Sequence, residues 1–214
     1  MKTYIINSTY LEAVHLASGK DSTRYINGVC VEPLADGTCA LAATDGDRFA
    51  GIGCDLKGKP PEDTFIMASD DIKKVIAAMK AEKKVIGKSL VKYLRLQVVK
   101  EPSRERTAMT VNIVLMQDND DNAEVLRTCV SFTTKAIDGN FPDYRRVITE
   151  KVKEKVEGDL CFDMSLAADF GTMAKLLGSD CQKVKFESGG PDNPIRIIIE
   201  ACSGFIGVLM PMRY

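Results

Sequence analysis

The sequence lacks the features that would place it in a membrane or around a metal ion. No apolar run approaches the roughly 18 residues that a membrane-spanning helix needs, and residues 1–6 are too short for the core of a signal peptide. The chain has one histidine, and no two of its seven cysteines have the spacing of metal ligands. We therefore expect a cytoplasmic protein with no metal or cofactor, in which the cysteines are buried and reduced.

An excess of charge is also missing, since 29 basic and 30 acidic residues leave a net charge of −1. A protein that coats nucleic acid with its whole surface needs a large basic excess, so this mode is excluded, although a local basic stripe is not. Hydrophobic residues make up 45% of the chain and charged residues 28%, which is typical of a folded globular protein. With 214 residues the chain can bury a sizeable core in one or two domains.

Catalytic motifs are absent as well. There is no nucleophile elbow, no phosphate-binding P-loop and no dinucleotide-binding glycine pattern. Asp45 and Asp47 resemble a carboxylate pair, but they lie where a strand gives way to a turn, and carboxylates there usually accept backbone hydrogen bonds. His15 falls within an apolar helical pattern, so we expect it to be packed or at the rim of the core. The sequence therefore predicts a binding protein rather than an enzyme.

The chain does contain a unit that is repeated three times. Each copy has an extended apolar segment, a capping serine or asparagine, an amphipathic helix and several strands. The first copy begins with a strand at 3–6 and a helix that is capped by Asn7 or Ser8 and runs to about Ser18. Strands at 28–32 and 39–43 follow, and the Asp-Gly pair at 36–37 predicts the hairpin turn between them.

The second copy has a strand at 64–67 and a helix capped by Ser69 that runs to about Lys80, with Asp70 and Asp71 in its first turn. Its strands alternate with period two at 93–99, 108–116 and 125–133. The polar stretches 100–106 and 117–124 are predicted to be long solvated hairpin loops.

The third copy opens at 160–163, and its helix is capped by Ser165, runs to about Leu177 and is ended by Gly178. Strands are predicted at 184–186, 195–200 and 205–209, with a turn at 191–194. The pattern predicts the α+β class.

Four strings carry a resemblance to a known family. They lie at residues 23–29, 44–50, 138–147 and 208–214. In this order they resemble the sliding clamp family, the beta subunit of bacterial DNA polymerase III. The resemblance implies a DNA-clamp fold, in which repeated β-α-β-β-β units pack their helices on one face of antiparallel sheets. Residues 1–150 match the family's middle domain and 151–214 the C-terminal half of its last domain, so the family's first domain has no counterpart here.

The resemblance further implies a hydrophobic groove that takes short linear peptides from DNA polymerases, clamp loaders and repair proteins. Methionine adapts to varied apolar side chains and proline supplies a rigid wall, which suits such a groove, and residues 208–214 are expected to be docked. Asp47 stands where most relatives have histidine, so one polar edge is expected to differ. The positions that match the groove are Ile26, Thr44, Gly46, Asp47, Arg48, Phe49, Pro142, Arg146, Val147, Val208, Met210, Pro211 and Met212.

Clamps of this family encircle duplex DNA and contact it through basic helices without reading its sequence. Lysines crowd the second predicted helix, and residues 24–25 match a family loop that touches DNA. A merely solvated helix face is the alternative interpretation of the lysines. The resemblance assigns DNA contact to Arg24, Tyr25, Lys73, Lys74, Lys80, Lys83 and Lys84.

The sequence thus predicts a sliding-clamp-like processivity factor in DNA replication, with a clamp-derived interaction protein that has lost the ring as the alternative. A closed ring of the family holds twelve units and this chain has three, so four chains would complete a ring. We therefore expect a homo-oligomer, a tetramer, in which a neighbour's first unit completes the half-domain after residue 150.

Overall fold

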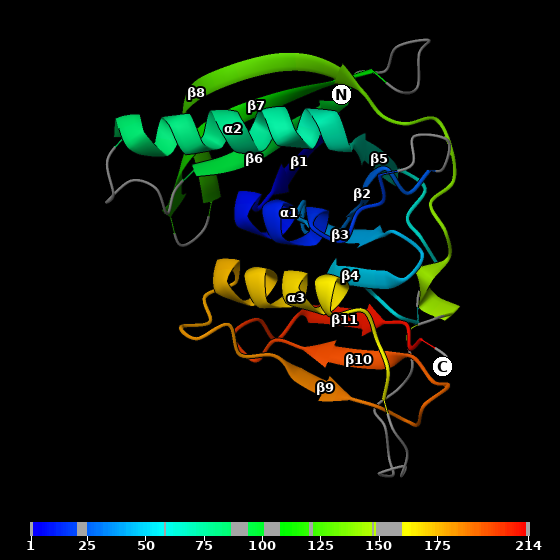
Figure 1. Cartoon of the computed structure of the whole chain (residues 1–214). Helices are drawn as coiled ribbons and strands as arrows, with labels where there is room; N and C mark the ends of the chain where they lie inside the picture. The colour runs from blue at the N-terminus through cyan, green and yellow to red at the C-terminus, as the bar shows by residue number, and fades with distance from the viewer. Residues whose placement is uncertain are drawn as a thin grey trace.

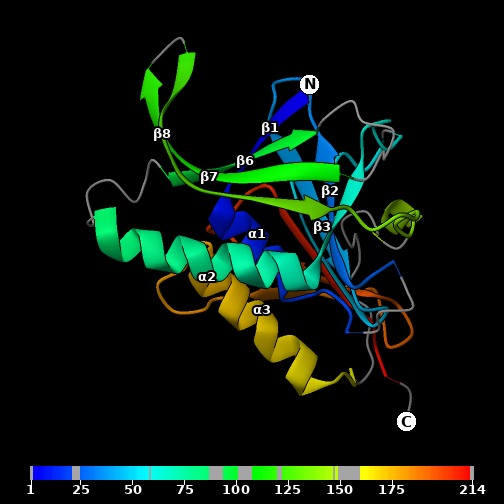
Figure 2. The same ribbon diagram turned by 90° about the horizontal axis from the view of Figure 1, so that it is seen from above.

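The computed structural model describes residues 2–20, 25–57, 59–86, 94–100, 108–119, 122–146, 148 and 160–212. Within them the chain forms two antiparallel sheets with three helices on one side, as Figures 1 and 2 show from two directions. The α+β class predicted from the sequence is confirmed. Arg24 and Val147 lie outside the described residues, as do residues 101–107, most of the first predicted loop.

The smaller sheet has the order β1-β6-β7-β8 and combines the first and second copies of the unit. Its strands are β1 (Lys2–Ile6), β6 (Leu94–Lys100), β7 (Ala108–Asn119) and β8 (Asn122–Lys135). The hairpin of β7 and β8 stays paired as far as Asn119 and Asn122, so the prediction of a solvated loop at 117–124 is wrong for these residues. Backbone pairing continues there because ladder hydrogen bonds do not require apolar side chains.

The larger sheet has the order β5-β2-β3-β4-β11-β10-β9. Its strands are β2 (Gly28–Pro33), β3 (Cys39–Thr44), β4 (Arg48–Ile52), β5 (Phe65–Ala68), β9 (Lys185–Glu187), β10 (Ile195–Ile198) and β11 (Phe205–Leu209). The sequence did not predict β4, which pairs with β11 and so joins the first copy to the third. The predicted Asp-Gly turn is confirmed, because Gly37 has a φ of 79° between β2 and β3.

The three helices are α1 (Ser8–His15), α2 (Ser69–Ile86) and α3 (Met164–Leu176). Asn7 caps α1, since its side chain accepts hydrogen bonds from the backbone of Thr9 and Tyr10. The predicted cap of α3 at Ser165 is wrong: Asp163 caps this helix and accepts from the Ser165 amide at 2.7 Å.

Two predicted helix ends also differ from the structure. Helix α1 stops at His15 rather than Ser18, and residues 16–18 follow in tighter turns. Helix α2 runs on to Ile86 rather than ending near Lys80, because Ile86 still packs against the core. Ser69 opens α2 as its first residue, directly after β5, and Asp70 and Asp71 lie in the first turn as predicted.

One hydrophobic core joins all three copies, and α1 lies between α2 and α3 over the sheets. Leu11, Ile72 and Phe170, one from each helix, are completely or almost completely buried in it. The larger sheet takes strands from both sides of residue 150, so the predicted domain boundary divides chain segments that share a sheet and a core.

The seven cysteines are all free thiols, as predicted, but their burial was overestimated. Only Cys30 is buried, and Cys181 is exposed because it lies in the turn region after α3. Among the described residues no group of three His, Cys, Asp or Glu side chains is placed to hold a metal ion. No helix in the described part of the chain is long and apolar enough to cross a membrane.

Candidate functional site: a groove beside strand β11

A groove of about 510 Å³ lies where β4 pairs with β11, close to the three-residue helix η2 (Tyr144–Arg146). This volume is in the range of small-ligand and peptide pockets. Segments far apart in the sequence meet here, since the register places Val208 of β11 opposite Phe49 of β4. The lining residues are Tyr25, Ile26, Thr44, Gly46, Arg48, Phe49, Asn140, Pro142, Asp143, Tyr144, Val208 and Met210.

The turn between β3 and β4 is held by its own polar side chains. The Thr44 hydroxyl donates to the Arg48 carbonyl at 2.6 Å and accepts from the Gly46 amide at 3.1 Å. One Asp45 oxygen accepts from the backbone amides of Asp47 and Arg48, at 3.1 and 2.9 Å. The turn role predicted for Asp45 is therefore confirmed. Gly46 has a φ of 104°, a left-handed conformation that favours glycine.

Arg48 links this turn to helix α3. Its side chain is 8% exposed, forms ion pairs with Asp45 and Asp169, and donates to the Leu166 carbonyl at 3.3 Å. Arg48 itself is buried, so removal of its carboxylate partners would leave a charge without compensation. Arg48 therefore fixes the position of α3 relative to the groove.

The floor of the groove is a small apolar cluster. The rings of Phe49 and Tyr144 stack with centroids 4.9 Å apart, and Phe141 meets Tyr144 edge-on at 6.4 Å. Val208, Cys30 and Ala42 complete the buried side of this cluster. Burial raises the pKa of the Tyr144 hydroxyl, so this group stays uncharged and the floor presents no ionisable group near neutral pH.

The structure brings eight of the predicted groove residues together at one cavity. They are Ile26, Thr44, Gly46, Arg48, Phe49, Pro142, Val208 and Met210. Four other predicted residues, Asp47, Arg146, Pro211 and Met212, are described but do not line the cavity. Arg146 lies in η2 with its side chain 84% exposed and paired with Asp143.

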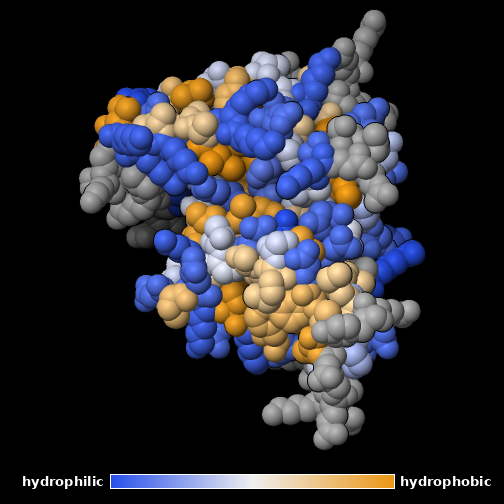
Figure 3. Space-filling model, in the orientation of Figure 1, coloured by the Kyte–Doolittle hydropathy of each residue, from blue (hydrophilic) through white to orange (hydrophobic). Residues whose placement is uncertain are grey.

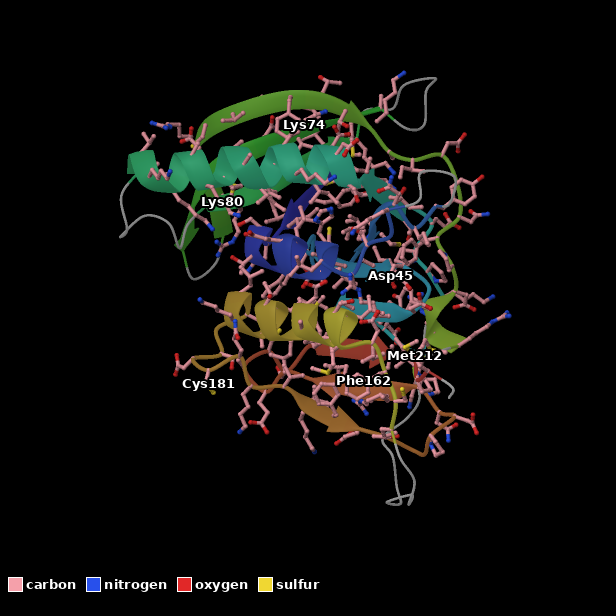
Figure 4. The ribbon with its side chains drawn as sticks, viewed as in Figure 1. Asp45, Lys74, Lys80, Phe162, Cys181 and Met212 are labelled. Carbon is pink, nitrogen blue, oxygen red and sulfur yellow. The ribbon has the colours of Figure 1, made fainter. Side chains whose placement is uncertain are left out.

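The segment after β11 is docked as predicted. The Met210 amide donates to the Asp47 carbonyl at 2.8 Å, and the Met212 amide donates to the Cys161 carbonyl at 2.7 Å. Asp47 thus holds the segment through its backbone rather than through its side chain. Figure 4 shows Met212 and Phe162 close to each other near this end of the larger sheet.

Sequence reasoning missed several lining residues, of which Tyr25 and Tyr144 are the largest. Tyr25 was assigned to DNA contact, but the structure places it on the groove, next to Gly139. Tyr144 lies inside the string 138–147, from which the resemblance assigns only Pro142, Arg146 and Val147 to the groove. The short helix η2 turns Tyr144 inward and Arg146 outward, and the sequence carries no periodic signal for so short an element.

The lysines predicted to contact DNA all lie on α2, but on different sides of it. Lys80 points toward α1, where it pairs with Glu12 at 2.8 Å, whereas Lys74 lies toward the sheet that contains β8 (Figure 4). Lys74 pairs at 2.8 Å with Asp71, which in turn accepts from Thr134 of β8. Lys74 and Lys80 therefore lie on different sides of α2.

Lys73 pairs with Asp70 at 3.1 Å and lines a second, polar cavity of about 510 Å³ between the helices, together with His15 and Ser69. His15 Nε2 lies 3.2 Å from the Ser69 hydroxyl. Burial, followed by the nearby charge of Lys73, lowers the pKa of His15. The remaining lysines, Lys83 and Lys84, lie in the last turn of α2.

The exposed side of α3 differs from that of α2. Its most exposed positions include Met164, Ala168 and Thr172, and only Lys175 adds a positive charge. Figure 3 shows hydrophilic atoms mixed with hydrophobic ones over α2 and a broader pale hydrophobic area over α3. Most of the positive charge of the helical layer therefore lies on α2.

No protein-family model matches the chain, and no curated protein matches it in sequence. Solved structures do match it. The DNA polymerase sliding clamp of Pseudomonas aeruginosa, solved with a ligand, has a TM-score of 0.67 and 16% identity, and the match covers 100% of this chain and 66% of that one. The DNA polymerase III beta subunit of Thermotoga maritima has a TM-score of 0.62 and 16% identity, and the match covers 100% of this chain and 66% of that one. The clamp of Bartonella birtlesii bound to griselimycin has a TM-score of 0.63 and 18% identity, with the same coverage of 100% and 66%.

The chain therefore spans about two thirds of the length of the clamps that it matches. The likeness extends over the whole chain, helices and sheets included, at a sequence identity too low for most side chains to agree. The chain has the fold of the bacterial DNA polymerase III beta subunit, the sliding clamp.

Proposed function

We propose that this protein is a sliding-clamp-like processivity factor, which tethers replication proteins to duplex DNA without catalysing a reaction. The observation that carries the proposal is the convergence of eight groove residues, from four separated strings, on one cavity of a chain with the clamp fold. A groove of this kind would bind short hydrophobic segments of a DNA polymerase, a clamp loader or a repair protein.

The groove offers apolar surface with a few polar groups, which is the usual composition of a peptide-binding site. Ile26, Phe49, Pro142 and Val208 supply the apolar surface, and Met210 stands at the edge with 37% of its surface exposed. Burying two or three peptide side chains at about 25 cal/mol per Å² supports micromolar affinity after the ordering costs are met.

The two exposed methionines after β11 allow a matched test of the groove. Met210 lines the cavity, whereas Met212 is 54% exposed and does not. Griselimycin, which was bound to the Bartonella birtlesii clamp, is a suitable probe, together with a short fluorescein-labelled peptide that contains leucine and phenylalanine. We expect Met210→Ala to weaken binding of both probes up to about tenfold, because a ligand that covers the exposed part of this methionine gains about 1 kcal/mol from it. Met212→Ala should leave binding unchanged.

Deletion of residues 210–214 should abolish binding while the far-ultraviolet circular dichroism stays that of the intact chain. Equal affinity of the intact and truncated chains in a calorimetric titration would show that the groove is not the peptide site.

For DNA, we propose that lysines of α2 contact phosphates without reading bases. Three of them already pair with carboxylates, but exposed ion pairs are worth only about 0–1 kcal/mol, so a phosphate can replace the partner. Replacing Lys73, Lys74 and Lys80 by glutamate should weaken binding of a linear duplex and flatten its dependence on salt. Lys183 and Lys185, which are similarly exposed and paired on the other side of α3, provide the control.

Encirclement of DNA requires a closed assembly. The first copy is already joined to the second through β1 and β6, so a neighbouring chain would meet this one at outer strands of the sheets, such as β8 and β9. Unpaired outer strands favour pairing with another chain. Light scattering at micromolar concentration tests the tetramer: we expect four times the mass of one 23.4 kDa chain.

The second candidate function is a clamp-derived interaction protein that keeps the groove and forms no ring. The groove is lined by residues of one chain, so it does not depend on a ring, and this favours the alternative. A mass near 23.4 kDa combined with normal probe binding would support it and exclude a ring closed by this chain alone.

A further inference from the structure

One wall of the groove separates two cavities. This wall consists of Pro142, Asp143 and Tyr144. These residues line the groove on one side and border a third cavity, of about 320 Å³, on the other. Side chains that pack against a solid core are fixed by that packing, whereas a wall with space behind it can shift. The position of this wall therefore depends on specific anchors.

Arg145 supplies such an anchor. Its guanidinium donates to both carboxylate oxygens of Glu32, at 3.2 and 2.7 Å, and through Nε to the Asp55 carbonyl at 2.9 Å. The two side chains are only 10% and 4% exposed. A planar guanidinium that uses three N–H groups in this way fixes both distance and orientation. Glu32 lies on β2 and Asp55 follows β4, so the anchor ties the wall to the larger sheet.

The anchor reaches the groove through Tyr144. The Arg145 guanidinium lies over the Tyr144 ring, 4.6 Å from its centroid, and the same ring stacks on Phe49 at 4.9 Å. Tyr144 and Phe49 line the groove, while Arg145 lines only the cavity behind it. We propose that Arg145 is a positioning residue, which holds the Tyr144 wall through Glu32 at the groove width that accepts a partner peptide. This inference rests on the proposed function of the groove.

The pair is better suited to positioning than to stabilising the fold. A buried ion pair recovers in attraction little more than it loses in desolvation, so its net contribution to stability is small. The geometry, in contrast, depends on the planar fork of the arginine. Lysine keeps the positive charge but has one donor centre instead of three, so it cannot hold Glu32 and the Asp55 carbonyl together.

The test uses Arg145→Lys and Glu32→Gln in the full chain, with Arg127→Lys as the control. Arg127 is 59% exposed and pairs with Glu82 at 3.7 Å, away from the groove. Affinity for griselimycin is measured by calorimetry, and the wall is followed by fluorine NMR of protein labelled with fluorotyrosine, with the Tyr144 signal assigned from Tyr144→Phe.

We expect Arg145→Lys and Glu32→Gln each to bind griselimycin about tenfold more weakly. The double variant should bind no more weakly than either one, because both substitutions remove the same anchor. The Tyr144 signal should move or broaden in both variants and stay in place in Arg127→Lys. An unchanged Tyr144 signal in Arg145→Lys, or a changed signal with unchanged affinity, would overturn the inference. If the unaltered protein fails to bind any probe, the proposed function fails, and the Tyr144 signal still decides whether Arg145 holds the wall.

Discussion

Gly207 of β11 lies beneath helix α3, and we predict that Gly207→Ala destabilises the protein. A Cβ atom at this position would lie 2.7 Å from Ile197 Cβ, 2.9 Å from a ring carbon of Phe170 and 3.1 Å from one of Phe205. All three neighbours are buried, and the two rings already contact each other edge-on with centroids 6.4 Å apart. No neighbour can withdraw without disturbing another.

Overpacking of this kind costs about 1–3 kcal/mol. In a chain of this size each kcal/mol lowers the melting temperature by about 2–4 °C, so a decrease of about 2–12 °C is expected. Gly189→Ala is the control, because the nearest atom to its added Cβ would be 3.7 Å away. Both variants restrict the unfolded chain equally, which alone stabilises a protein by about 0.4–1 kcal/mol. The difference between them isolates the steric effect.

Thermal unfolding followed by circular dichroism and calorimetry provides the measurement. If the two variants melt at the same temperature, β11 is not packed as closely beneath α3 as described. The position of β11 is relevant to the groove as well, because the next residue, Val208, lines it.

Three further predictions concern single side chains. Phe49→Ala should lower the free energy of unfolding by about 3–5 kcal/mol in urea titrations, since Phe49 is 2% exposed and stacks on Tyr144; a loss below about 1 kcal/mol would contradict this packing. Because the pKa of His15 is lowered in the folded state, the unfolded chain takes up the proton first, and stability should fall as pH decreases from about 6.5. The urea midpoint of His15→Gln should fall less over the same range, and parallel pH profiles would refute this role. Exposed Cys181 should react with Ellman's reagent before Cys54, whose thiol pKa burial raises to about 11, as mass spectrometry of labelled peptides would show.

Local patterns in the sequence predicted most elements of the fold but not their long-range pairing. Helix periodicity and turn residues are encoded by neighbours in the chain, so α1, α2, α3 and the turn at Gly37 were all predicted. The pairing of β4 with β11 joins residues about 159 positions apart, as in Phe49 and Val208, and no local rule specifies it. The cap of α3 was misplaced for a different reason: Asp163 and Ser165 are both good capping residues, and the sequence alone does not distinguish them.

The four strings predicted eight of the residues that line the groove, but not Tyr25 or Tyr144. Residues within each string were recognised, but their side-chain directions were not, so Tyr144 was omitted and Arg146 included. The ion pair of Arg145 and Glu32 could not be predicted from any one string, because its members are 113 residues apart and only the folded chain brings them together.

The weak positive charge of the helical layer links the proposed DNA binding to the proposed ring. Helix α2 carries five lysines against three carboxylates, α1 contributes Glu12, and α3 contributes one charge of each sign. Such a surface is only weakly positive, so a single chain would release few counterions and hold a linear duplex loosely. Weak attraction is adequate if the chains close around the duplex, because a closed ring then prevents escape while the duplex slides. A weak helical face is of little use to an open monomer, so a monomeric mass would also remove the main reason to assign these lysines to DNA, leaving the groove as the functional surface.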